Sequence, residues 1–120
     1  MIKNRINESW NLKTTENLNQ MLRVNDEAEV NAEYSSILII KHNYHAADDL
    51  MFPDPSCLAF FTAFEENHLA KYEDMRLVAV DIFEGAMTFY IYVIEAQKSL
   101  YDCISFFKSN PNYRVDFEIK

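Results

Sequence analysis

Two histidines and two aspartates lie close together near the middle of the sequence. His42 and His45 are followed by Asp48 and Asp49, and imidazole and carboxylate groups are ordinary ligands of zinc and iron. Residues three apart on a strand point to opposite faces of a sheet, so the histidines can share an ion only if the strand ends between them. The alternatives are a metal site and a solvated strand end with an acidic loop. We favour the second and expect no metal or other cofactor.

The two cysteines lack the surroundings of a catalytic nucleophile. Cys57 and Cys103 fall on the apolar sides of helix-patterned stretches, whereas a nucleophilic thiol needs a base within reach. Their wide spacing is also unlike a disulfide framework. The sequence therefore predicts buried thiols in a reducing compartment. Together with polar first residues and no long apolar run, this favours a cytoplasmic protein.

One carboxylate stands out from the many acidic residues. Asp81 lies in an apolar strand pattern, with Thr88 expected opposite and Tyr90 on the diagonal. It is either a functional acid on an open sheet face or a surface carboxylate held by Thr88 and tyrosine hydroxyls, and the second is the commoner arrangement. The other adjacent carboxylates are expected on solvated surfaces, because a general acid needs a cleft that shifts its pKa.

The elements that must position these residues begin with a strand and a helix. The apolar, β-branched run inside residues 36–44 predicts a buried strand. After an acidic loop, Asp54 and Pro55 have the types preferred at the cap and first position of a helix. The helix should extend to about Tyr72. The apolar side of this helix is expected to carry Cys57, Phe60, Phe61, Phe64 and His68. The solvent-exposed side is expected to carry Glu65, Glu66, Lys71 and Glu73.

A hairpin follows, and the only glycine marks its turn. Two alternating stretches within residues 75–95 meet at Glu84 and Gly85, where a tight turn requires positive φ. Pairing Phe83 with Ala86 sorts the side chains by face. The predicted pairs are Ile82 with Met87, Val80 with Phe89 and Val78 with Ile91 on the apolar face, and Asp81 with Thr88, Ala79 with Tyr90 and Leu77 with Tyr92 on the other.

The last two elements complete the expected fold. A helix over residues 96–109 precedes an alternating strand over 113–119. The predicted order is βαββαβ, which with right-handed crossovers gives an α+β ferredoxin-like sandwich: a four-stranded antiparallel sheet with two helices on one face. This domain covers residues 35–120. Residues 1–34 form an irregular N-terminal lead-in, compatible with a short helix at 16–20 and an added strand at 21–25.

Four stretches of this pattern resemble a known family. They are the strand at 37–41, the loop Phe52-Pro53-Asp54, the helix sequence FTAFEE at 61–66 and the hairpin strand TFYIYV at 88–93. They are similar to a bacterial family of small ferredoxin-like domains of unknown function, related to the regulator B inhibitor of ribonuclease E. The resemblance implies a cytoplasmic, non-enzymatic domain that docks on a ribonuclease.

The charge narrows the class of partner. The 120 residues contain 11 Lys+Arg and 19 Asp+Glu, for a net charge of −8, which disfavours nucleic acid and anionic membranes because both are polyanions. We therefore expect a protein that inhibits or regulates a basic partner, such as a ribonuclease or a toxin neutralised by an immunity protein. A homodimer that forms through the open sheet face is also compatible with the sequence. The expected partner-binding residues are Asp81, Tyr90, Tyr92, Asp116 and Glu118 on the sheet, and Asp48, Asp49 and Asp54 in the loop.

An alternative function belongs to a different class. A small ligand-binding or metal-binding domain, or an enzyme, would use the open sheet face and the loop that carries His42 and His45. This alternative requires a pocket.

Overall fold

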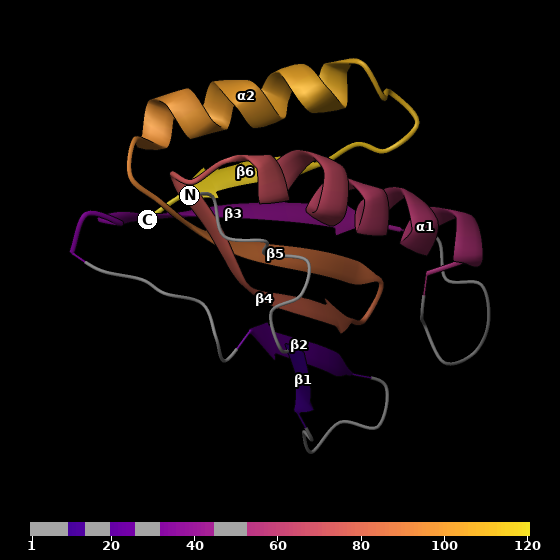
Figure 1. Ribbon diagram of the computed structural model, residues 1–120. Helices are drawn as coiled ribbons and strands as arrows, with labels where there is room; N and C mark the ends of the chain where they lie inside the picture. The colour runs from indigo at the N-terminus through magenta and orange to yellow at the C-terminus, as the bar shows by residue number, and fades with distance from the viewer. Residues whose placement is uncertain (1–9, 14–19, 26–31, 45–52) are drawn as a thin grey trace.

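The protein has two layers, an antiparallel sheet and a helical layer on one of its faces (Figure 1). The computed structural model describes residues 10–13, 20–25, 32–44 and 53–120. In chain order the elements are β1 (Trp10–Lys13), β2 (Met21–Asn25), β3 (Ser36–Asn43), α1 (Pro55–Ala63), η2 (Phe64–His68), η3 (Leu69–Lys71), β4 (Met75–Phe83), β5 (Ala86–Val93), α2 (Ala96–Lys108) and β6 (Asp116–Ile119). The strands lie side by side in the order β1-β2-β4-β5-β3-β6.

The predicted sheet of four strands is too small, because the described sheet is open and has six. The added strand expected at residues 21–25 is confirmed as β2, which pairs with β4 and places Arg23 opposite Val80. β1 pairs with β2 and was not predicted. It has only four residues, which is too short for its alternation of apolar and polar residues to predict a strand, so its formation depends on its partner. The short helix expected at residues 16–20 lies outside the described residues, apart from Gln20.

The hairpin between β4 and β5 turns at Glu84 and Gly85, which have φ values of 50° and 82°. Two central residues with positive φ are the signature of the type I′ turn, which matches the twist of paired strands. The predicted register is confirmed from the turn as far as Ala79 opposite Tyr90.

Beyond Tyr90 the predicted register is wrong. A β-bulge between Leu77 and Ala79 shifts the pairing, because a bulge adds one residue to only one strand of a pair. Leu77, rather than Val78, is therefore opposite Ile91. Arg76, rather than Leu77, is opposite Tyr92.

The first helical span is continuous but not uniform. Asp54 caps α1 as predicted, since its carboxylate accepts a hydrogen bond from the Cys57 amide at 2.8 Å, and Pro55 is the first helical residue. A π-helical turn, η2, follows α1 directly, and its Leu69 amide donates to the Phe64 carbonyl five residues back. The 3₁₀ turn η3 then ends the span at Lys71, one residue before the predicted end.

The core between the helices and the sheet is dominated by aromatic rings. Phe60 stacks on Tyr113 with ring centroids 4.1 Å apart, and Phe61 lies 5.4 Å from Phe89 by the same measure. We call this group the aromatic cluster; its members are Phe60, Phe61, Phe64, Phe89, Phe106, Phe107 and Tyr113. The strand predicted from residue 113 starts only at Asp116. Tyr113 instead contributes its ring to the cluster.

Both cysteines are buried thiols, as the helical pattern predicts. Burial, followed by the nearby Asp54 carboxylate, raises the pKa of Cys57 to about 11. Burial, followed by Asp102, raises the pKa of Cys103 to about 12. Thiolate is the nucleophilic form, so neither side chain is an activated nucleophile at neutral pH.

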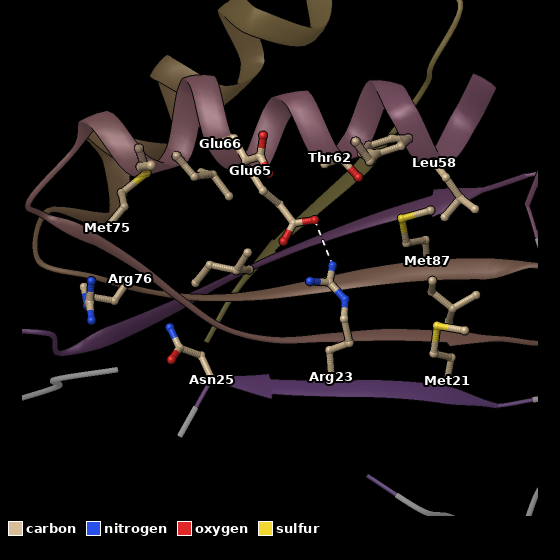
Figure 2. Close-up of a pocket in the computed structure, with 15 residues that line it drawn as sticks. Met21, Arg23, Asn25, Leu58, Thr62, Glu65, Glu66, Met75, Arg76 and Met87 are labelled. Atoms are coloured by element: carbon tan, nitrogen blue, oxygen red, sulfur yellow. Dashed lines mark hydrogen bonds and ion pairs between the residues drawn. The ribbon is translucent and has the colours of Figure 1, made fainter. Parts of the chain in front are cut away.

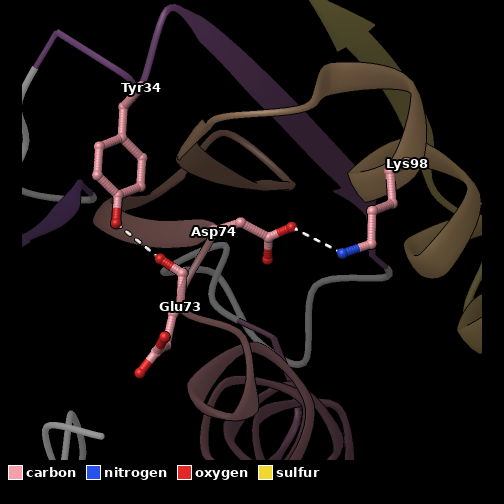
Figure 3. Close-up of polar contacts among 4 residues, drawn as sticks. All are labelled: Tyr34, Glu73, Asp74 and Lys98. Atoms are coloured by element: carbon pink, nitrogen blue, oxygen red, sulfur yellow. Dashed lines mark hydrogen bonds and ion pairs between the residues drawn. The ribbon is translucent and has the colours of Figure 1, made fainter. Parts of the chain in front are cut away.

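Polar contacts fix the turn that leads from η3 into β4 (Figure 3). The Tyr34 hydroxyl donates to the Glu73 carbonyl oxygen at 2.7 Å, and Lys98 Nζ lies 3.1 Å from Asp74 Oδ2. The turn is thus attached both to the segment before β3 and to the first turns of α2. These attachments hold the end of the helical span over β4.

Candidate functional site

A cavity of about 260 Å³ lies between the first helical span and the sheet (Figure 2). Its roof comes from α1, η2 and η3, and its floor from β2, β4 and β5. Met21, Ile82 and Met87 are among the apolar residues of the floor. The cavity lies where β2 extends the sheet past β4.

An ion pair crosses this cavity from floor to roof. Arg23 Nη2 of β2 lies 2.8 Å from Glu65 Oε2 of η2 (Figure 2). The side chains are 32% and 15% exposed, respectively, so the carboxylate is the more desolvated partner. Burial raises the pKa of Glu65, and the attraction of Arg23 lowers it in part. A carboxyl group of this kind accepts a proton more readily than one in water.

Two features of the backbone bring these side chains together. The pairing of Met21 with Ile82 and of Arg23 with Val80 places alternate residues of β2 on the helix-covered face. The π-turn adds one residue relative to an α-helical turn and carries Glu65. The prediction that Glu65 lies on the solvent-exposed side of the helix is therefore wrong, whereas Glu66, Lys71 and Glu73 are exposed as predicted.

A second arginine lies at one end of the cavity. Arg76 of β4 is only 4% exposed and lines the cavity with Asn25, which is 7% exposed. Neither arginine was predicted as a site residue. The alternation of Met21, Arg23 and Asn25 in a predicted strand was the available indication, because it places a charge on the same face as an apolar neighbour.

The opposite face of the sheet carries the sheet residues predicted to bind a partner. Strand pairing aligns them in two rows that run across β2, β4, β5, β3 and β6. The first row is Leu22, Asp81, Thr88, Lys41 and Asp116, and the second is Val24, Ala79, Tyr90, Ile39 and Glu118. Tyr92 follows Tyr90 on the same face of β5. We call the sheet face that carries these two rows and Tyr92 the open face.

The open face differs from the prediction in its details. Asp81 accepts a hydrogen bond from the Gln20 side-chain amide at 2.8 Å, a partner that the sequence did not indicate. Lys41 stands between Thr88 and Asp116, so the face is not uniformly acidic. The open face therefore combines tyrosines and aliphatic residues with charges of both signs.

Of the three predicted loop residues, the structure describes only Asp54. Asp54 is the cap of α1, and Asp48 and Asp49 lie outside the described residues. His42 is also placed differently from the prediction of a solvated strand end. Its side chain is 7% exposed, since β3 continues through Asn43 and the residue lies on the helix-covered side with Leu38 and Ile40.

The surroundings of His42 are those of a packed core residue. Its ring lies 4.9 Å from that of Phe61 between centroids, and Nδ1 is 2.7 Å from the Arg114 carbonyl oxygen. A carbonyl oxygen only accepts, so Nδ1 carries the donated proton. His45 lies outside the described residues. Among the residues that are described, no group of three or more His, Cys, Asp or Glu side chains is arranged to hold a metal ion.

These features define the protein as a small α+β domain with an open antiparallel sheet, two helices on one face and a cavity crossed by an ion pair. The chain belongs to a family of unknown function, DUF695, whose family model matches residues 9–120. This family match makes no link to the regulator B inhibitor or to a bacterial source. Neither the curated proteins nor the solved structures contain a significant match to the chain. In the described part of the chain, none of the helices has the length and apolar character needed to span a bilayer.

Proposed function

We propose that this protein is a non-enzymatic, cytoplasmic domain whose open face binds and restrains a basic protein, such as a nuclease or a toxin. The observation that carries this proposal is the cross-strand alignment of Asp81, Tyr90, Asp116 and Glu118, which belong to three different strands but to two adjacent rows of the sheet.

The composition of the open face suits a protein partner. Tyrosine supplies a large, rigid surface with a polar end and is enriched at the energetic centres of interfaces. Asp116 and Glu118 are exposed at the β6 edge of the sheet, where they add negative charge on one side of the tyrosines, two strands away from β5. Together with a net charge of −8, this arrangement favours fast association with a surface rich in arginine and lysine.

The finer statements about fold and descent belong to the same proposal. We propose that β3, β4, β5 and β6 with the two helices form a ferredoxin-like core to which β1 and β2 are added. The support is the partial strand order β4-β5-β3-β6 together with helices on a single face. A relation to the ribonuclease E inhibitor would make a ribonuclease the basic partner, and an immunity protein would have a toxin in its place.

The proposal is tested by charge-matched variants of the full chain. The face variant carries Asp81→Asn, Asp116→Asn and Glu118→Gln, and the control carries Glu66→Gln, Glu73→Gln and Glu95→Gln, three exposed positions away from the face. Each variant loses three negative charges. We expect the unmodified chain to capture an identifiable basic protein from lysate at about 0.05 M salt and to release it at about 0.5 M.

The comparison between the variants decides the outcome. The face variant should lose the captured protein, and the control should retain most of it. Equal loss in both variants would mean that net charge alone attracts the protein, and the open face would then be no binding site. Capture only of acidic proteins would also contradict the proposal.

A further inference from the structure

We propose that the outer edge of β6 binds an extended segment of the basic partner as an additional antiparallel strand, in which basic side chains alternate with apolar ones. This inference deepens the proposed function and rests on it, because it states how part of that partner is recognised. It is drawn from the direction of the backbone groups of β6, from the two faces of this strand and from the charges along it.

The hydrogen bonds between β6 and β3 show which backbone groups are already used. β6 is the last strand in the order of the sheet, and within the parts of the chain that the structure describes it pairs with β3 alone (Figure 1). At one end of this pairing, Ile37 and Lys120 exchange both of their backbone hydrogen bonds, at 2.8 and 2.9 Å. Lys120 therefore directs its amide and carbonyl groups toward β3.

The directions of the preceding residues follow from this pair. Hydrogen-bonded and non-hydrogen-bonded pairs alternate along an antiparallel ladder. Glu118 and Asp116 therefore also direct their backbone groups toward β3. Phe117 and Ile119 direct theirs away from the sheet, where a further strand would lie. Such a strand would bond to these groups without displacing any bond between β6 and β3.

The side chains of β6 give an added strand a different neighbour on each face. Asp116 and Glu118 are exposed on the open face. Phe117 and Ile119 are half-buried on the helix-covered face and pack against the core. The Phe117 ring lies 6.2 Å from that of Phe107 between centroids. A strand that alternates basic and apolar residues would place its cations beside the carboxylates and its apolar side chains against the edge of the core.

The carboxylates occupy the positions at which contact with an added strand is closest. That strand would form its hydrogen-bonded pairs with Phe117 and Ile119. Asp116 and Glu118 would then lie in the non-hydrogen-bonded pairs, whose Cα atoms are about 4.5 Å apart rather than about 5.5 Å. Opposite charges directly across a ladder are favourable. Lysine or arginine therefore fits opposite both carboxylates.

Two lysines near these carboxylates refine the expected pattern. Lys41 is opposite Asp116 on β3, so it lies one strand further from an added strand than Asp116 does. Lys120 Nζ lies 3.8 Å from Glu118 Oε1, and the two side chains are 64% and 61% exposed. An exposed pair of this kind contributes little, so Glu118 can also pair with a cation of the partner. An acidic residue fits opposite Lys120, which gives an antiparallel segment the order acidic, basic, basic from its N-terminus.

A second copy of the chain is a poorer occupant of this edge. Pairing β6 with itself about Phe117 would place Asp116 opposite Glu118 of the other copy. Pairing about Glu118 would place two glutamates opposite each other. Like charges directly opposite are destabilising, and each copy has a net charge of −8. The edge is therefore better suited to a segment of a basic protein.

The test is an NMR titration of the isotope-labelled full chain with the capped peptide EVKVKV. In the free chain, the amides of Phe117 and Ile119 should exchange rapidly with solvent. Those of Asp116 and Glu118 should exchange slowly, because they are bonded to β3. The peptide should shift and protect the first two amides. The peptide EVVKKV has the same composition but places its lysines on opposite faces, and it should bind about fivefold more weakly.

Backbone methylation of the peptide tests the direction of pairing. In the proposed arrangement, the valine amides opposite Phe117 and Ile119 face β6, and the lysine amides face away from it. N-methylation of those two valines should therefore weaken binding about tenfold or more. N-methylation of the two lysines should change the affinity little.

A charge reversal tests the side-chain pairs. Asp116→Lys combined with Glu118→Lys should weaken EVKVKV about tenfold and should make EVEVEV the preferred peptide. The control combines Glu73→Lys with Glu95→Lys, two exposed positions away from this edge, and changes the net charge equally. It should still prefer EVKVKV.

Several results would overturn the proposal. They are a failure of EVKVKV to bind, equal binding of EVKVKV and EVVKKV, and a block by methylated lysines rather than by methylated valines. Protection of the Phe117 and Ile119 amides in the free chain would also overturn it, because the edge would already be covered. If that protection rises with protein concentration, a second copy is the occupant.

The capture experiment described for the proposed function separates the two proposals. If the face variant loses its captured protein but EVKVKV does not bind the unmodified chain, only the inference about the β6 edge is wrong. If EVKVKV binds as expected but no basic protein is captured, the proposed function is wrong, and the edge remains a site for an extended basic peptide.

Discussion

The aromatic cluster and the cavity lie under the same helical span and on the same face of the sheet, yet one is filled and the other is not. Phe61 and Phe64 contact rings from β5 and α2 in the cluster. A few residues away, Glu65 reaches across open space to Arg23. The difference follows from the sheet, because β2 widens the floor beyond the strands that the two helices cover together.

This comparison separates two regions that contribute differently to stability. Closely packed rings stabilise a fold through buried area and contact. A cavity with an ion pair is less favourable for stability, since desolvation offsets the attraction between the charges. We therefore expect substitutions in the cluster to change the free energy of unfolding more than substitutions in the cavity do.

The largest expected effect is the loss of an aromatic ring from the cluster. Phe64 is fully buried, and Phe64→Ala should lower the free energy of unfolding by about 3–5 kcal/mol. Leu58→Ala changes a cavity residue that is 40% exposed, and a loss of about 1 kcal/mol or less is expected. Urea denaturation of both variants measures the difference. Losses of equal size would contradict the division between a stabilising cluster and a less stabilising cavity.

An intermediate effect is expected at the start of the span that covers both regions. Asp54→Ala removes the cap of α1 and should lower the free energy of unfolding by about 1 kcal/mol. Asp54→Asn is the matched control, because asparagine is an equally good cap without the charge. If both variants bind the basic partner as well as the unmodified chain does, Asp54 is a structural residue only. If Asp54→Asn is as unstable as Asp54→Ala, the capping interpretation is wrong.

The smallest expected effect is a pH dependence of opposite sign in the two regions. Burial raises the pKa of Glu65 above its usual 4.5, despite the attraction of Arg23 and with a small contribution from Glu66. Burial lowers the pKa of His68 below 6.5, with Asp102 opposing the shift and Lys71 adding to it. The stability contributed by protonated Glu65 is complete below pH 4.5 and is lost as the pH rises through its raised pKa. The stability contributed by neutral His68 is present above pH 6.5 and is lost as the pH falls through the lowered pKa of this histidine.

Two variants measure these contributions separately. As the pH falls from about 7.5 to about 4.5, the unmodified chain should gain stability relative to Glu65→Gln and lose it relative to His68→Phe. The phenylalanine keeps a ring between Phe64 and Phe106, whose centroids lie 5.5 and 4.7 Å from that of His68. Urea denaturation at several pH values is the measurement. Parallel curves for all three proteins would show that neither group is coupled to folding.

The elements with strong local patterns were predictable from the sequence. Asp54 before Pro55 located the start of α1, and Gly85 located the hairpin turn, because capping and positive φ depend on the residue itself. The β-bulge between Leu77 and Ala79 was not predictable in this way. Residues 77–80 form a continuous apolar run, so nothing in the sequence marks Val78 as the extra residue, and only the partner strand shows that the pairing shifts.

The cavity was less accessible to sequence reasoning than the open face. The open face follows from alternation within each strand, so Asp81, Tyr90 and Glu118 could be assigned to it before their neighbours were known. The ion pair of Arg23 with Glu65 joins residues that are 42 positions apart. It also requires the docking of β2 and a π-turn, and neither has a distinct local sequence pattern.

The π-turn at η2 has an evolutionary consequence. A change of length within a helix normally rotates every later residue by about 100° around the axis. This turn already holds one residue more than an α-helical turn, so losing a single codon between Phe64 and His68 would restore a uniform helix with both flanks in place. The residues between them are Glu65, Glu66 and Asn67, so the loss of any one of them would still leave a glutamate directly after Phe64. We expect homologues to fall into two length classes at this turn.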